Sequence, residues 1–291
     1  MRFVPILIAF LLGGCALAGD EVLDDATLDS MEVSGIGSET IRFVDGEWEG
    51  RPVVPGGASR PNAHLLRNSR VEHDFDGDGR SERAVVLSYG GGGSGRFAWL
   101  MILSPGWNAP KEEARFRLGD RIQIIDLEVV DDSIVMSAVV HGPEDAACCP
   151  TLLRRWIWVR GEGGWTEEVV DGPTLSLAHL DGSRWRLERN GRGLEVGDSL
   201  EVTLEIDGDG FAGSTGCNRY GLQVVESGVR NLKAGPIMVT RRACPPEQST
   251  WERELLDGLE NLVSYGWIDG RLVLGSLQQN QYETLYFARI R

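Results

Sequence analysis

Residues 216–221 read Gly-Cys-Asn-Arg-Tyr-Gly, and residues 240–244 read Thr-Arg-Arg-Ala-Cys; these two stretches are the most specific sequence pattern in the C-terminal part of the chain. Glycine permits tight backbone turns, and asparagine tolerates the left-handed region. We therefore expect a tight loop around Cys217, with Asn218 in a left-handed turn. After the second stretch, the prolines at 245 and 246 predict a fixed entry into a helix.

The sequence around these stretches predicts a sheet with a single helix. Apolar runs with strand character are Ser183–Glu188, Leu200–Ile206, Tyr220–Val225, Ile237–Thr240, Arg271–Leu274 and Glu283–Ile290. The helix is expected over about residues 247–264, because Ser249 and Glu252 have capping-box spacing. Its apolar positions, Trp251, Leu255, Leu259, Leu262 and Val263, share one face. We expect that face to pack against the sheet.

Upstream of about residue 172 the sequence predicts a second, separate unit. Its apolar runs are Arg83–Ser88, Phe97–Leu103, Ile122–Val130, Ile134–Val140, Leu153–Arg160 and Trp165–Val170, with Gly- and Asp-rich turns between them. The pattern breaks near Asp171-Gly172-Pro173. The predicted fold class is mostly β (β-rich α+β), with an antiparallel β module over residues 39–172 followed by a sheet with one helix.

The C-terminal pattern also carries a family resemblance. Beside the two stretches quoted above, the chain has Leu-Asp-Gly-Ser-Arg-Trp at 180–185, Glu-Leu-Leu at 254–256, Tyr265, and Gly-Arg-Leu-Val-Leu at 270–274. Over residues 178–291 this resembles the META domain, the family of the bacterial heat-shock lipoprotein HslJ. The resemblance implies a compact sheet with a helix, an envelope location and a link to stress or drug tolerance. It implies no known catalytic activity.

The N-terminus predicts export. Arg2 precedes an apolar run over residues 3–12, which is too short to cross a bilayer as a permanent helix, so residues 1–18 are predicted to be a signal peptide. Leu-Gly-Gly-Cys at residues 12–15 resembles the lipobox of bacterial lipoproteins, in which Cys15 is acylated. The alternative is cleavage after Ala18, which would release a soluble secreted protein.

The net charge of the chain limits the classes of partner that it can bind. A formal net charge of −15 argues against nucleic acid or anionic lipid, because both would be repelled. Residues 20–49 contain ten carboxylates and only one basic residue, Arg42. We therefore expect an acidic, solvated tether over residues 19–38.

The β module contains a candidate calcium loop. Residues 74–82 read Asp-Phe-Asp-Gly-Asp-Gly-Arg-Ser-Glu, with carboxylates at positions one, three, five and nine and the turn glycine Gly79 at position six. The expected metal-site residues are Asp74, Asp76, Asp78, Arg80 and Glu82. The usual glutamate at position twelve is replaced by Val85. A structural calcium ion is the predicted cofactor, and the alternative is an Asx-rich turn with solvated carboxylates.

A vicinal cysteine pair is the second unusual feature of the module. The block Asp145-Ala146-Ala147-Cys148-Cys149-Pro150 is the most specific part of a resemblance, over about residues 41–170, to an uncharacterised module of secreted bacterial proteins. Cys148 could act as a nucleophile, because the residue types that such a site needs lie close to it in the sequence: His141 as the base and Asp145 as the group that orients the base. Because export exposes thiols to oxidation, we instead expect a disulfide between Cys148 and Cys149.

Export also predicts the state of the remaining cysteines. Cys217 and Cys244 are candidates for a disulfide that joins the Gly-Cys-Asn loop to the helix start, worth on the order of 3 kcal/mol in the chain-entropy model. The alternative is a free, reactive thiol. With Cys15 set aside, the other four cysteines form two pairs, each inside one predicted domain.

Together these features predict an envelope lipoprotein that is not an enzyme. It would be anchored to a membrane through lipid and face the periplasm or the exterior, or be secreted without the lipid. It would support stress tolerance by binding an unknown envelope protein or ligand. We do not expect it to bind nucleic acid. The alternatives are a glycan- or peptide-binding module, with Trp156, Trp158 and Trp165 as a stacking surface, or an enzyme that uses Cys148.

Overall fold

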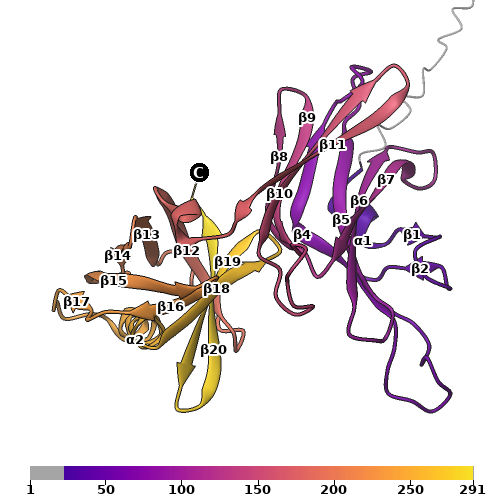
Figure 1. Ribbon diagram of the computed structural model, residues 1–291. Coiled ribbons are helices and arrows are strands. Elements are labelled where there is room, and N and C mark those ends of the chain that lie inside the picture. Colours follow the sequence, from indigo (N-terminus) through magenta and orange to yellow (C-terminus); the bar gives the residue numbers. More distant parts are fainter. Residues whose placement is uncertain (1–22, 291) are drawn as a thin grey trace, which may run out of the picture.

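The computed structural model describes residues 23–290, which form two β-rich units in chain order (Figure 1). The predicted fold class is therefore confirmed. The predicted signal peptide, Cys15 and the first residues of the predicted tether, up to residue 22, lie outside the described residues. None of the described helices is long and apolar enough to span a membrane.

The first unit is built on two antiparallel sheets. The first sheet has the order β3-β4-β5-β6-β7, with β3 (Glu47–Glu49), β4 (Asn62–His73), β5 (Glu82–Gly90), β6 (Arg96–Ser104) and β7 (Lys111–Asp120). The second has the order β11-β10-β9-β8, with β8 (Gln123–Val130), β9 (Ser133–Val140), β10 (Leu152–Gly161) and β11 (Gly164–Thr174). Val86 and Leu100 of the first sheet share one buried core with Met136 and Trp158 of the second.

The N-terminal segment covers the other face of the five-stranded sheet. It contains α1 (Asp25–Asp29) and a short pair of strands, β1 (Glu32–Val33) and β2 (Ile41–Arg42). Leu28 and Ile41 are fully buried and belong to one apolar cluster with Val85 and Leu87 of β5. Because side chains alternate along a strand, β5 buries one set of residues in each of its two cores.

The prediction of a solvated tether over residues 19–38 is therefore wrong from Leu23 onward. Its carboxylates form ion pairs with arginines of β4: Asp25 Oδ1 lies 3.0 Å from Arg70 Nη1, and Asp29 Oδ2 lies 2.8 Å from Arg67 Nη1. These arginines are distant in the sequence, so the segment looks unbalanced in charge when it is considered alone. Its apolar residues are few, but the sheet buries them.

The second unit is a closed antiparallel sheet. Its strands, in the order β14-β13-β12-β20-β19-β18-β16-β15, are β12 (Ser183–Asn190), β13 (Thr203–Asp207), β14 (Gly210–Ser214), β15 (Arg219–Gly228), β16 (Asn231–Ala234), β18 (Leu262–Ile268), β19 (Arg271–Gln278) and β20 (Gln281–Arg289). Pairing of β14 with β15 closes the sheet, and β17 (Met238–Val239) adds to β15. Closure leaves few unpaired strand edges.

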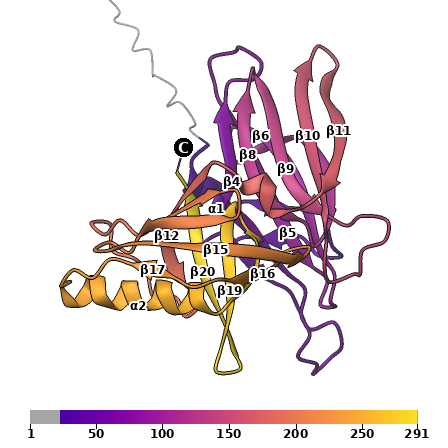
Figure 2. The ribbon, with the colours of Figure 1, turned by 60° about the vertical axis from the view of Figure 1, so that its left-hand side comes forward.

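Helix α2 (Pro246–Glu260) packs against β19 and β20 of this sheet (Figure 2). Trp251, Leu255 and Leu259 on its apolar face are buried in the same core as Trp185 and Phe287. The predicted packing of that face is confirmed.

Both predicted ends of this helix need correction. Pro245 is the N-cap and Pro246 the first helical residue, so Ser249 lies inside the helix and does not form the predicted capping box. Proline suits the first helical position, where its missing N–H costs nothing. The helix ends at Glu260, because Leu262 and Val263 belong to β18, which pairs with β19.

The two units are connected by more than the chain between β11 and the 3₁₀ turn η1 (Leu177–Leu180). Asp269, in the turn between β18 and β19, accepts hydrogen bonds from the backbone N–H of Asn68 (3.2 Å) and from Ser69 Oγ (2.8 Å). The side chain of Gln123 in β8 accepts the backbone N–H of Trp267 at 3.2 Å. These bonds hold β18 beside β4 and β8 of the first unit.

Candidate functional site

The aspartate-rich loop connects β4 to β5. Gly79 has φ +86°, which confirms the sharp turn predicted there, and Gly77 has φ +74°. Asp74 accepts the backbone N–H of Gly77 on Oδ1 at 2.8 Å and that of Gly79 on Oδ2 at 2.9 Å. The glycines therefore wrap the backbone around the first aspartate of the loop.

Three carboxylates converge in this loop. One oxygen of each of Asp74, Asp76 and Asp78 lies within 4.8 Å of the others. Calcium binds oxygen at about 2.3–2.6 Å, so two oxygens on one ion lie at most about 5 Å apart. The three predicted aspartates thus fit a single calcium ion.

The other two predicted metal-site residues are placed differently. Glu82 lies under the loop with 2% of its surface exposed, and it accepts the backbone N–H of Phe75 at 2.9 Å. It is not one of the three converging carboxylates. Burial raises the pKa of its carboxyl group, and the nearby charges of Asp76 and Asp78 act in the same direction. The side chain of Arg80 donates to the carbonyl of Pro105 at 3.4 Å.

Two residues beside the loop gave no signal in the sequence. Arg160 of β10 lies 3.7 Å from Asp76 Oδ2 through Nη2 and 2.5 Å from Glu113 Oε2 through Nη1. Glu113 comes from β7, so the loop lies where the two sheets of the first unit meet. A cation bound by the aspartates would therefore brace the junction of both sheets.

Both predicted disulfides are present. Cys148 is bonded to Cys149, and Cys217 to Cys244 with a Cα–Cα distance of 6.0 Å. The second bridge ties the loop before β15 to the residues that enter α2. Neither pair offers a free thiol.

The hydrogen bonds around Cys148 do not form the relay that thiol chemistry needs. His141 Nε2 lies 3.0 Å from the carbonyl oxygen of Ala147. Asp145 accepts the backbone N–H of Gly142 (2.8 Å) and both the N–H (2.6 Å) and the hydroxyl (2.7 Å) of Thr151. These hydrogen bonds lower the pKa of the Asp145 carboxyl group, and the bond from the Gly142 N–H contributes most. Asp145 therefore holds the loop in shape, and no hydrogen bond among the described residues joins it to His141.

Asn218 is a buried residue at the centre of a hydrogen-bond network in the second unit. Only 2% of its surface is exposed, and its Nδ2 donates to Glu252 Oε2 in α2 at 2.8 Å. Its Oδ1 accepts the backbone N–H of Arg242 (2.8 Å) and the hydroxyl of Thr240 (3.0 Å). The left-handed turn predicted at Asn218 is wrong: φ is positive at Gly216 (+87°) but not at Asn218. The asparagine is needed for its amide.

The tryptophans considered as a sugar-stacking surface face inward. Trp156 and Trp158 are 2% and 0% exposed, and their rings stack at a centroid distance of 6.3 Å. Trp165 packs edge-on against Phe75, with centroids 5.1 Å apart. These residues supply core packing between the sheets, in accord with the alternation of positions 156 and 158.

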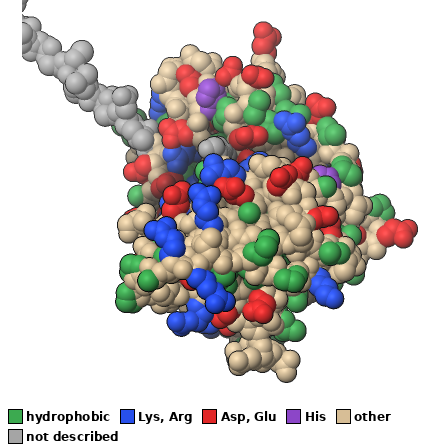
Figure 3. Space-filling view, turned by 90° about the vertical axis from the view of Figure 1, so that its left-hand side faces the viewer, with side chains coloured by type: hydrophobic (Ala, Val, Ile, Leu, Met, Phe, Trp, Pro, Cys, Tyr) green, Lys and Arg blue, Asp and Glu red, His purple; other side chains and the backbone are tan. Residues whose placement is uncertain are grey.

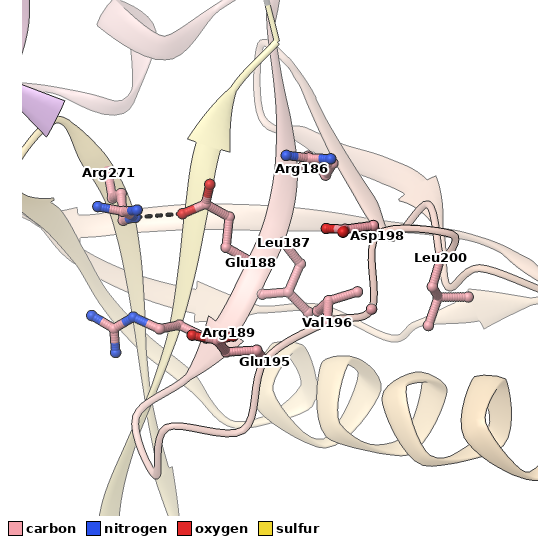
Figure 4. Close-up of a pocket in the computed structure, with 10 residues that line it drawn as sticks. Arg186, Leu187, Glu188, Arg189, Glu195, Val196, Asp198, Leu200 and Arg271 are labelled. Carbon is pink, nitrogen blue, oxygen red and sulfur yellow. Dashed lines mark hydrogen bonds and ion pairs between the residues drawn. The ribbon is translucent and has the colours of Figure 1, made fainter.

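The second unit has a polar hollow of about 270 Å³ beside β12 and β19 (Figure 4). Its charged lining residues are Arg186, Glu188, Arg189, Glu195, Asp198 and Arg271. Arg271 and Glu188 form an ion pair, and the Arg189 guanidinium lies 3.6 Å from the centre of the Tyr286 ring. Acidic and basic groups are equal in number, so the hollow favours neither charge. The same mixture of charges covers the face shown in Figure 3.

Comparison with known proteins assigns the second unit. Residues 178–289 match the META domain family. The chain is similar to an NMR structure of a protein from Burkholderia xenovorans, with 22% identity over 42% of this chain and 94% of that one and a TM-score of 0.31. A second NMR structure is 20% identical over 39% of this chain and 95% of that one, with a TM-score of 0.32. No curated protein matches the chain.

The matched residues coincide with the structural unit. They begin in η1, include every strand of the closed sheet and α2, and end at the last residue of β20. The predicted resemblance at the C-terminus is confirmed, and residues 178–289 of this chain form a META domain.

Proposed function

We propose that this chain is an exported envelope protein, anchored through lipid on Cys15, that supports the envelope under stress by binding and bracing and not by catalysis. The observation that carries the proposal is that a META domain is joined to a second unit and that each of the two contains a disulfide. Disulfides persist in oxidising compartments outside the cytoplasm. The lipobox-like residues 12–15 support the anchor.

The geometry around Cys148 supports a role without catalysis. A nucleophilic cysteine needs a thiolate beside a proton acceptor. Here the sulfur is bonded to Cys149, and the candidate base, His141, is directed to a carbonyl oxygen. The bridged loop is best described as a rigid surface feature.

Complementation of a strain that lacks the gene tests this function. Wild-type protein is expected to fractionate with membranes and to restore survival after heat shock. Cys15→Ala, which removes the acylation site, is expected to appear in the soluble fraction and to restore survival poorly. A double Cys148→Ser, Cys149→Ser variant is the matched control and should retain both properties. Loss of complementation by a folded, membrane-bound form of this control would favour thiol chemistry, and unchanged survival of the deletion strain would remove the stress role.

We further propose that Asp74, Asp76 and Asp78 bind a structural calcium ion. When bound, the ion would neutralise three converging carboxylates and fix the loop between β4 and β5. Asp76 is linked to β10 through Arg160, so order in the loop would extend to the second sheet.

Calorimetry on the full-length chain is expected to show one calcium site. Asp78→Asn removes one anionic ligand and should weaken binding by about tenfold or more, because the number of charged ligands sets calcium affinity. At a calcium concentration 100 times the Kd, the ion should stabilise the wild type by about 2.7 kcal/mol in thermal or chemical denaturation.

Asp209→Asn is the control for this experiment, since Asp209 is an exposed carboxylate in the turn between β13 and β14. It should leave calcium binding unchanged. Absence of heat with the wild type, or equal heat with wild type and Asp78→Asn, would remove the calcium proposal and leave an Asx-rich turn.

A further inference from the structure

A cavity of about 490 Å³ lies between the two units. Its lining includes His64 and Leu66 of β4, Arg96 of β6, Ile124 of β8, and Trp267 and Ile268 of β18. Small-molecule sites typically have volumes of about 300–1,000 Å³, occur at domain interfaces, and combine an apolar wall with a few polar groups. The cavity has these properties, and neither unit alone forms it.

Arg96 provides the positive charge of the cavity. It is half-buried, and its guanidinium donates to Ser88 Oγ at 3.1 Å and to the side-chain oxygen of Asn62. Both partners are neutral, and no described carboxylate forms an ion pair with this guanidinium. A guanidinium in a partly desolvated position binds carboxylates strongly, with two parallel hydrogen bonds.

The other charged groups of the lining have partners of their own. Arg121 is paired with Asp120. Asp269, the carboxylate of the lining, accepts hydrogen bonds from Asn68 and Ser69 and lies 3.9 Å from Arg271 Nη1. Among the described residues, the Arg96 guanidinium is therefore the cation of the lining that has no ion-pair partner, and it lies beside an apolar wall.

The cavity also has room on either side for an elongated molecule. One adjoining hollow shares His64 and Arg96 with it and extends to Trp48. Another shares Arg121 and Ile122 and extends to His141. Arg96 lies at the boundary of the first hollow, so a bound head group there would leave the apolar wall free for the rest of the ligand.

We propose that this cavity binds an amphipathic carboxylate, with the head group on Arg96 and the apolar body against Leu66, Ile124 and Ile268. The net charge of −15 repels anions over the molecule as a whole, so binding would come from this local site. The inference depends on neither the lipid anchor nor calcium, and it adds a ligand class to the proposed function.

Titration of the full-length chain with sodium decanoate, below its micellar concentration, tests the site by calorimetry. Decanoate is expected to bind with one-to-one stoichiometry. Decan-1-ol has the same alkyl chain but no charge, so we expect it to bind about tenfold more weakly or worse. Arg96→Gln should reduce decanoate affinity by about tenfold or more and leave decanol binding unchanged. Ile268→Asn, at a residue that is 53% exposed and so tolerant of change, should weaken both ligands.

Arg253→Gln is the matched control, because Arg253 is an exposed arginine of α2 outside the cavity lining. It should bind decanoate like the wild type. Three results would overturn the proposal: no binding of decanoate, equal affinity for decanoate and decanol, or equal losses in Arg96→Gln and Arg253→Gln. Ile268→Asn decides the matter if Arg96→Gln does not fold, since unchanged decanoate binding by that variant would exclude the cavity.

Discussion

Replacement of Asn218 by alanine is expected to lower the free energy of unfolding of the META domain by about 2 kcal/mol. The change removes an amide that bonds Glu252 in α2 and both Thr240 and Arg242 in the segment before the helix. Each buried polar group that loses its partner costs about 1–3 kcal/mol. Three groups lose a partner here. Thr240 and Arg242 are exposed, so water recovers part of the cost for them, and Glu252 is partly buried and keeps the hydrogen bond from the Thr215 hydroxyl at 2.6 Å.

Urea denaturation followed by tryptophan fluorescence measures this loss, since Trp185, Trp251 and Trp267 lie in the core of this domain. Asn231→Ala, at an exposed position of β16, is the matched control and should change the free energy by less than about 0.5 kcal/mol. If Asn218→Ala also falls within that limit, the amide network does not stabilise the domain and our account of the Gly-Cys-Asn stretch is wrong.

Removal of the Cys217–Cys244 bridge by a double serine replacement is expected to cost about 3 kcal/mol. The two cysteines are 27 residues apart, so the bridge closes a loop of substantial size and restricts the unfolded chain. Replacing both residues avoids leaving a single reactive thiol. The same denaturation experiment gives the loss, and reduction of the wild type should reproduce it.

The vicinal pair provides the comparison. Cys148 and Cys149 are adjacent, so their bridge closes almost no chain, and a double serine variant should lose far less stability. Equal losses in the two double variants would contradict the chain-entropy account. A larger loss for the vicinal pair would point instead to packing of that loop.

Much of the local structure was predictable because the responsible interactions are short-range. Alternation of apolar residues predicted most strands of both units, and the spacing of aspartates and glycines in residues 74–82 predicted a turn with converging carboxylates. The apolar stripe of α2 was found from its helical period, although its ends were not. Those ends depend on Pro246 and on the pairing of β18, which begins immediately after the helix.

The N-terminal segment shows where composition misleads. Its carboxylates suggested solvation, but Asp25 and Asp29 meet Arg70 and Arg67, and Leu28 is fully buried against the first sheet. Charge balance in a folded protein is a property of neighbours in space. A window of sequence contains only the neighbours along the chain.

The β-rich class, the META pattern, both cysteine pairs and the three aspartates of the loop could be predicted from the amino-acid sequence, because each rests on residues close together or on a motif of defined spacing. The closure of the second sheet through β14 and β15, the placement of Arg160 beside Asp76, and the cavity beside Arg96 depend on the tertiary structure. Each of these requires segments from distant parts of the chain to meet. The periodicity of a short stretch of sequence does not predict which distant segments come into contact, because those contacts depend on how the sheets and units pack together.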